Sequence, residues 1–160
     1  MDIVAAPDKS ISFTVPGAPV PKGRPKARVV KGAGGGFAQI YTDAKTREYE
    51  TRVGQWARKA MTGQRPIEGP CSLVVIFYFQ LPKSRPKYQF EAMRRGELPC
   101  TNQVDLDNCL KAVQDGMNEI VFKDDRQIVS VVAHKRWADE PRVLVRVVPH
   151  GDGQAMRGAE

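Results

Sequence analysis

Four aspartates and one lysine stand in two short stretches of the sequence, at spacings that suit metal chemistry. Asp105 and Asp107 are separated by Leu106. In an extended segment, residues two apart point to the same side of the chain. The two carboxylates would then be presented together, with Leu106 turned inward. Such oxygen ligands suit a hard cation that keeps several of its waters when a protein binds it.

The residues that follow have helical spacing from about Asp107 to Glu119. One face of this predicted helix is apolar and should belong to the core: Leu110, Val113, Met117 and Ile120. Another face carries Asp107, Lys111 and Asp115, each four residues after the last. Asp107 and Lys111 can therefore act at one point, with the carboxylate toward a metal and the ammonium toward a phosphate.

A second acidic pair, Asp124 and Asp125, lies after this helix and just before a strand predicted to start near Gln127. A short return to the sheet can bring one of them back to the first pair. A bound metal lowers the pKa of an attacking water, and a fixed cation stabilises charge in the transition state. These parts suit phosphodiester hydrolysis. Neither histidine, His134 nor His150, sits in a nucleophile motif that would offer another mechanism.

Each part also has a simpler interpretation when it is taken alone. One of Asp105 and Asp107 could serve simply as the cap of a helix. Asp124 and Asp125 could form a turn. Lys111 could be a solvated helix residue, and Asp115 either an exposed residue or a partner of Lys111. The combination of these residues with an excess of positive charge favours the catalytic interpretation.

A basic stretch without acidic residues precedes these motifs. Between Val20 and Lys31 the chain carries five cations: Lys22, Arg24, Lys26, Arg28 and Lys31. The whole chain of 160 residues has a formal charge of +7 and a pI of about 9.5. Such an excess favours a polyanionic partner, although solubility could explain part of it. Lys22, Arg24, Lys26 and Arg28 are therefore candidates for contacts with a DNA backbone, and the alternative is a solvated loop.

The composition also excludes several classes of protein. The longest apolar run, 73–79, is too short to cross a bilayer, so we expect no membrane attachment. The three cysteines are odd in number and widely spaced, which argues against a zinc site or a disulfide framework. We interpret them as reduced thiols in a cytoplasmic protein.

The pattern of elements predicts one α+β domain, a mixed β-sheet with two main helices packed on it. The expected domain covers residues 1–148, and the Gly-rich residues 149–160 are expected to be disordered. Asp43 should cap the first helix, and the strand 71–81 should be central and covered on both faces. The remaining predicted elements are strands at 10–15, 127–137 and 142–148, two short strands around the glycine loop 32–36, a short helix at 88–95 and the helix at 107–119.

Together these motifs resemble the RusA family of Holliday-junction resolvases, especially its phage and prophage members. The resemblance rests on Asp105-Leu106-Asp107-Asn108, Lys111 and Asp115, and on the run from Lys123 to Val129. It is supported in the N-terminal part by residues 16–25, Tyr41-Thr42 and 46–49.

The resemblance implies roles for particular residues. Asp105, Asp107 and Asp125 correspond to the metal-binding aspartates, with Asp124 as an uncertain fourth carboxylate, and Lys111 corresponds to the catalytic lysine. It further implies Mg²⁺ as cofactor, four-way DNA junctions as substrate, and a homodimer that makes paired nicks. Some members have a basic residue before the first aspartate, where this chain has Val104.

Two other functions fit the same residues. The chain could be a less selective metal-dependent nuclease acting on flaps or branched DNA, or a DNA-binding module that has lost catalysis. The complete acidic set argues against the second. The preferred cut sequence, the number of metals, the dimer interface and any contact between the glycine loop 32–36 and DNA stay open.

Overall fold

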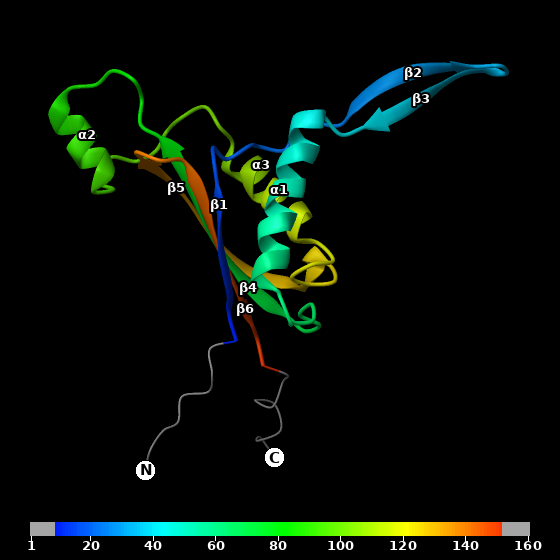
Figure 1. Cartoon of the computed structure of the whole chain (residues 1–160). Coiled ribbons are helices and arrows are strands. Elements are labelled where there is room, and N and C mark those ends of the chain that lie inside the picture. Colours follow the sequence, from blue (N-terminus) through cyan, green and yellow to red (C-terminus); the bar gives the residue numbers. More distant parts are fainter. Residues whose placement is uncertain (1–8, 152–160) are drawn as a thin grey trace, which may run out of the picture.

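The fold is built on a mixed four-stranded sheet. The computed structural model describes residues 9–151 (Figure 1). The strands lie in the order β1 (Ile11–Pro16), β6 (Arg142–Pro149), β4 (Cys71–Gln80) and β5 (Ile128–Ala138). β6 is antiparallel to both of its neighbours, and β4 is parallel to β5. The predicted α+β class and mixed sheet are confirmed.

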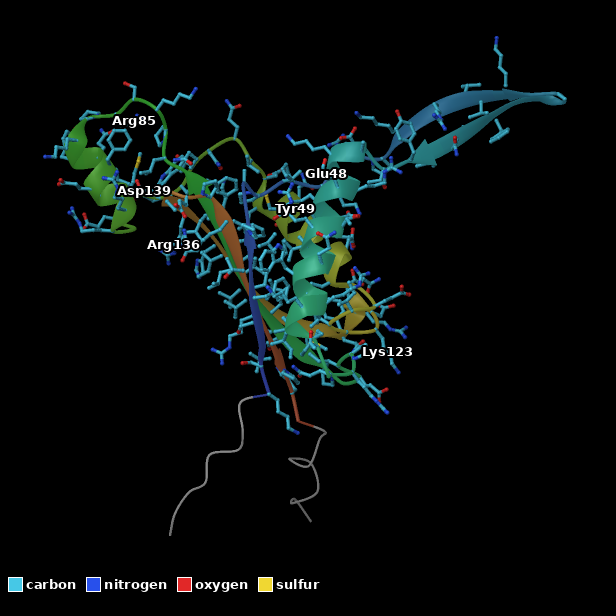
Figure 2. All side chains as sticks on the ribbon, in the orientation of Figure 1. Glu48, Tyr49, Arg85, Lys123, Arg136 and Asp139 are labelled. Atoms are coloured by element: carbon cyan, nitrogen blue, oxygen red, sulfur yellow. The ribbon has the colours of Figure 1, made fainter. Side chains whose placement is uncertain are left out.

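Two helices cover the same face of this sheet. They are α1 (Ala44–Ala60) and α3 (Leu106–Met117), which pack on each other, with α1 also against β1 and α3 against β5 (Figure 1). The short helix α2 (Lys87–Arg94) stands at one end of the sheet, near β5. Side chains from the sheet and from α1 fill the layer between them (Figure 2).

The central strand β4 was predicted to be covered on both faces, and this is wrong. Its residues alternate between buried and partly exposed along its length, since the helices lie on one face only. Leu73, Val75 and Phe77 point into the core and are at most 1% exposed. Their neighbours Val74 and Ile76 face the uncovered side. The continuous apolar run therefore reflects one buried face and one open apolar face.

The helix α1 begins after Asp43, as predicted, but the Asp43 side chain does not cap it. Its carboxylate instead accepts a hydrogen bond from Lys26 Nζ at 2.8 Å. The apolar stripe of the helix is buried as expected at Tyr49, Val53 and Ala57. Asp43 therefore fastens the segment before the helix, not the first turn itself.

The two short strands around the glycine loop form a hairpin that projects from the body (Figure 1). They are β2 (Lys26–Gly32) and β3 (Gly35–Tyr41), paired with each other and with no strand of the main sheet. Every residue of β3 is exposed. The hairpin therefore contributes little to the core.

The helices α1 and α3 approach closely where each has a glycine. A Cβ on Gly116 would lie 2.7 Å from Val53 Cβ and 2.9 Å from the Glu50 carbonyl oxygen. Since the backbone oxygen cannot yield as a flexible side chain could, Gly116→Ala should push the helices apart. We expect the free energy of unfolding to fall by about 1–3 kcal/mol, the usual effect of overpacking a core.

Chemical denaturation measures this loss. Gly34→Ala is the matched control, because nothing lies within 4 Å of the added methyl group. It should change the free energy of unfolding by less than about 0.5 kcal/mol. An unchanged stability for Gly116→Ala would contradict the tight crossing.

The predicted boundary at residue 148 falls near the end of β6. Pro149 is still in that strand, and His150 N–H donates to the Pro70 carbonyl oxygen. The rest of the predicted disordered tail, residues 152–160, lies outside the described residues. Within residues 9–151, no helix is long and apolar enough to cross a membrane.

Candidate functional site

The first two aspartates lie at the start of α3. This helix begins at Leu106, so Asp105 takes the N-cap position and Asp107 lies in the first turn. The extended geometry used to align their side chains therefore does not apply. Leu106 between them does pack against the core, as expected. The two carboxylates reach solvent at the same helix end.

The carboxylate of Asp105 does not serve as the cap. It makes no cap hydrogen bond, and its Oδ2 accepts one from Asn108 Nδ2 at 3.2 Å. Asp107 is exposed, and its side chain makes neither a hydrogen bond nor an ion pair within residues 9–151. Both aspartates therefore keep oxygen atoms available for a ligand.

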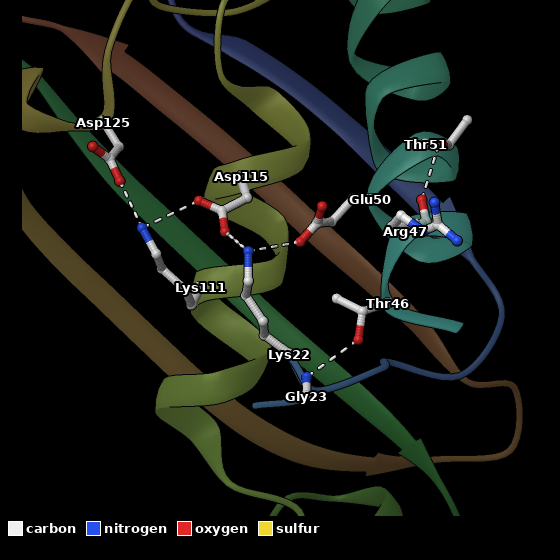
Figure 3. A network of polar contacts seen from close by, with 9 residues as sticks. All are labelled: Lys22, Gly23, Thr46, Arg47, Glu50, Thr51, Lys111, Asp115 and Asp125. Carbon is white, nitrogen blue, oxygen red and sulfur yellow. Dashed lines mark hydrogen bonds and ion pairs between the residues drawn. The ribbon is translucent and has the colours of Figure 1, made fainter. Parts of the chain in front are cut away.

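One turn further along α3, Lys111 joins the second acidic group to the helix. Its Nζ lies 2.9 Å from Asp125 Oδ2 and 3.1 Å from Asp115 Oδ1 (Figure 3). Of the two interpretations of Asp115, an exposed residue or a partner of Lys111, the structure therefore supports the second. An ammonium has three donors, so two carboxylates leave one donor for a further acceptor. The side chain of Lys111 is 49% exposed, so such an acceptor can come from solvent.

These ion pairs keep both groups charged. The hydrogen bond from Lys111 is the main reason why the pKa of Asp125 is held below its ordinary value. The same hydrogen bond is the main reason why the pKa of Lys111 is raised. Asp125 is therefore a carboxylate and Lys111 an ammonium at neutral pH.

Lys22 extends this network from the N-terminal segment. Its ammonium pairs with Asp115 and lies 3.0 Å from Glu50 Oε1 on α1 (Figure 3). Burial lowers the pKa of Lys22, but the hydrogen bonds to Asp115 and Glu50 outweigh this effect and raise it. The backbone N–H of Lys22 also donates to the Asn108 carbonyl oxygen. Lys22 thus fastens its segment to both helices.

A short 3₁₀ turn, Asp125–Gln127, positions Asp125. Asp124 precedes it and caps it, accepting a hydrogen bond from the Arg126 N–H at 2.9 Å. The Gln127 side chain accepts from the Lys123 and Asp124 backbone N–H groups and donates to two carbonyl oxygens of the 67–69 segment. Asp124 therefore has a structural task, while Asp125 points toward Lys111.

Lys135 supports the other side of the site. It projects from β5, and its Nζ donates to the carbonyl oxygens of Asn102 (3.0 Å) and Val104 (2.7 Å). These bonds hold the loop that leads into Asp105. Sequence reasoning did not identify Lys135 or Gln127 as positioning residues. For Gln127 a signal existed, since Asp124-x-x-Gln127 has the spacing of a capping box.

The donor set fits a hard cation such as Mg²⁺. Asp105 and Asp107 are exposed at the first turn of α3, one turn before Lys111, and the partly exposed Asp125 pairs with Lys111. In the described part of the chain, no three acidic, histidine or cysteine side chains converge closely enough to form a ready cluster. Mg²⁺ commonly takes only one or two protein carboxylates and fills its remaining positions with water and substrate phosphates.

The four candidate DNA contacts fall in two environments. The Lys22 side chain is 25% exposed and held by two carboxylates. Arg24, Lys26 and Arg28 are exposed, with Lys26 paired to Asp43 and Arg28 bonded to Gln39 Oε1 at 2.9 Å. The structure thus brings Lys22 to the ion pairs of Lys111 through Asp115, and leaves Arg24, Lys26 and Arg28 more open to solvent.

The three cysteines, Cys71, Cys100 and Cys109, are free and buried. Burial raises the pKa of the Cys109 thiol to about 12, although this residue lies within the acidic motif. Cys109 is therefore a neutral core residue on the buried face of α3 and plays no part in the chemistry of the exposed face.

Two comparisons with known proteins bear on the family of this chain. Residues 16–148 match the family described as Endodeoxyribonuclease RusA. The chain is also 34% identical over 142 residues to the uncharacterized protein YqaN of Bacillus subtilis (strain 168), an alignment that covers 86% of this chain and 94% of that protein. The family match spans the basic segment, α3 and the turn with Asp125. The chain therefore belongs to the RusA family of endodeoxyribonucleases.

Proposed function

We propose that this endodeoxyribonuclease resolves four-way DNA junctions by Mg²⁺-dependent phosphodiester hydrolysis. Family membership supports a nuclease that resolves Holliday junctions. The observation that carries the proposal is the placement of Lys111 between Asp125 and Asp115, one turn after Asp107. We expect the protein to act on DNA in the cytoplasm, where its free thiols would stay reduced.

In this proposal Asp105, Asp107 and Asp125 hold the metal, and Asp124 serves the turn. A bound Mg²⁺ would supply activation of water and neutralisation of charge on phosphate oxygens. Lys111 directs its third donor at the scissile phosphate or the leaving group. Asp115 keeps the ammonium in place, and Lys22 with Glu50 keeps Asp115 in place.

Cleavage of matched substrates tests this function. A four-way junction, a flap and a linear duplex of related sequence are incubated with the full chain and Mg²⁺. We expect symmetrical nicks in the junction and little cutting of the duplex. Equal cutting of flap and junction would favour the less selective nuclease instead, and no cutting of any substrate would favour the DNA-binding module.

The basic segment is proposed to contact phosphates. Neutralising Arg24 or Arg28 should each reduce the salt slope of junction binding by about 0.9. Lys26 should behave similarly, because its pairing with Asp43 is exposed. Lys22→Gln should change the slope least, because two carboxylates already neutralise this ammonium. Binding measured across a salt series gives the slopes, and an unchanged slope after all four replacements would show that the segment is only solvated.

We also propose a homodimer, because paired nicks need two active sites and the chain has one acidic set. β4 is central in the sheet, so neither of its edges is open to pairing with a second copy. The uncovered sheet face is a better candidate. Val74 and Ile76 lie there beside Val132 (46% exposed) and Leu144 (40% exposed), their partners in register.

Sedimentation at micromolar concentration tests this assembly. Wild type should sediment as a dimer, and Leu144→Glu as a monomer with little change in thermal stability, because Leu144 is already partly exposed. Val29→Glu, on the hairpin, is the control and should stay dimeric. A wild-type monomer that makes paired nicks would refute the proposal.

A further inference from the structure

The β2–β3 hairpin presents two different faces. Residues paired across an antiparallel ribbon point to the same side. One face carries three pairs, from the root outward Lys26 with Tyr41, Arg28 with Gln39, and Val30 with Phe37. The opposite face carries the pairs Ala27 with Ile40 and Val29 with Ala38, followed by Lys31 with Gly36. The first is cationic and aromatic, and the second mainly aliphatic.

The hairpin exposes more apolar surface than its own fold requires. Phe37 is 59% exposed and Tyr41 39%, while Val29 and Ile40 are each 73% exposed. The side chains of both strands stand clear of the sheet and helices (Figure 2). A two-stranded ribbon alone is marginally stable in water, so such a ribbon is best explained by a ligand that contacts it.

Charge identifies the chemistry of that ligand. The hairpin carries Lys26, Arg28 and Lys31, and no acidic residue occurs between Lys9 and Thr42. On the first face the Arg28 guanidinium lies 5.6 Å from the centre of the Tyr41 ring. Cations interleaved with exposed aromatic rings suit nucleic acid, because phosphates attract the cations and bases stack on the rings.

The order of groups along the arm indicates which part of the DNA it meets. The polar pair Arg28 and Gln39 lies nearer the root, and the apolar pair Val30 and Phe37 lies nearer the tip. Beyond them Lys31 lies on the opposite face, and the rest of the tip is glycine with one alanine, from Gly32 to Gly36 with Ala33. On the face that carries Arg28 and Phe37, no hydrogen-bonding side chain lies beyond the ring, whereas an arm that reads base edges with this face would need one. An exposed ring such as Phe37, followed by a narrow glycine tip, instead suits a wedge between bases.

The root of the arm is fixed relative to the acidic site. The Gly23 N–H donates to Thr46 Oγ1 at 3.2 Å (Figure 3), and Lys26 pairs with Asp43. From Lys26 to Val30 the strand extends about 13 Å. A wedge carried there would stand at a set distance from α3 and could orient a branch point relative to the aspartates.

We propose that the hairpin enters the branch point of the DNA, where Phe37 stacks on a base displaced beside the crossover and Arg28 contacts the adjoining backbone. This inference rests on the proposed function, since it needs a branched substrate. It adds an element that opens the junction, separate from the residues that cut it.

The experiment places 2-aminopurine, a base whose fluorescence rises when it unstacks, beside the crossover of a synthetic four-way junction. The full chain is added in Ca²⁺ in place of Mg²⁺, so that binding is followed without cleavage. Wild type should raise the fluorescence. Phe37→Ala and Phe37→Leu should abolish the rise and weaken junction binding about 5- to 150-fold, as expected for loss of one stacked base. Phe37→Tyr should retain the rise. The affinity of all three Phe37 variants for linear duplex should equal that of wild type.

Ile40→Ala is the matched control, because Ile40 is similarly exposed on the opposite face. It should behave as wild type. A normal signal and affinity in Phe37→Ala would overturn the wedge, and so would an equal loss of junction and duplex binding, which would indicate a groove contact. If Ile40→Ala alone weakened binding and dissociated the protein, the arm would instead contact a second copy. Failure of wild type to prefer junctions over duplex would contradict the proposed function itself and the wedge with it.

Discussion

Asp105→Asn should abolish cleavage of a four-way junction while leaving its binding intact. The substitution removes one negative charge from the proposed metal ligands and keeps the size of the side chain. Asparagine is as good an N-cap residue as aspartate, so the position at the start of α3 tolerates it. Binding should survive, because losing a negative charge does not weaken attraction to phosphate. Asp107→Asn and Asp125→Asn should behave in the same way.

Two further variants make this test specific. Asp139→Asn removes an exposed carboxylate that pairs with Arg94 and should leave cleavage unchanged. Asp124→Asn keeps an oxygen that can cap the turn and should retain most activity if Asp124 is not a ligand. Single-turnover cleavage in Mg²⁺ and junction affinity in Ca²⁺ are measured for each. Near-normal cleavage by Asp105→Asn or Asp107→Asn would contradict the metal assignment.

Lys111→Ala should slow single-turnover cleavage by about 10²- to 10³-fold, with a much smaller effect on junction affinity. This is the typical effect of losing one well-placed electrostatic contact in the transition state. Lys111→Arg keeps the charge but changes its shape and reach, so it should restore the rate only in part. Lys123→Ala, on the nearby turn, removes an exposed lysine paired with Glu68 and serves as the control.

Three results can be told apart by measuring rate and affinity together. A normal rate for Lys111→Ala would remove this residue from the mechanism. Equal losses of rate and affinity would mean that Lys111 only grips the phosphate in the ground state. Because removing Lys111 leaves Asp115 and Asp125 without their shared cation, thermal denaturation should accompany the assay, and a folded variant with a selective loss of rate supports the proposal.

Local patterns predicted most of the fold. The helical spacing of α3 and the apolar runs of the strands depend on neighbours in sequence, and the helix and strands that they predicted are present. The covering of β4 could not be predicted this way, because an open apolar sheet face and a buried one have the same composition. The missing cap at Asp43 has a related cause, since its competing partner, Lys26, lies 17 residues away.

The candidate site shows the same division. Spacing along one helix predicted that Lys111 could meet Asp115, and the ion pair is present. The convergence of Asp125 on Lys111 depends on a turn that Gln127 bonds to a distant loop. The bridge from Lys22 to Glu50 and Asp115 joins three segments far apart in the chain. Its charge alone predicted that Lys22 contacts DNA. Its ion pairs with Glu50 and Asp115 instead favour a role in positioning Asp115.

Cutting of a supercoiled plasmid with an extruded cruciform tests the central claim most directly. A single nick relaxes the plasmid and removes the cruciform, whereas two paired nicks give a linear product. We predict linear product from wild type in Mg²⁺, none in EDTA, and none from Asp105→Asn in Mg²⁺. Nicked circles without linear product, linear product in EDTA, or normal cutting by Asp105→Asn would contradict a metal-dependent resolvase built on this aspartate.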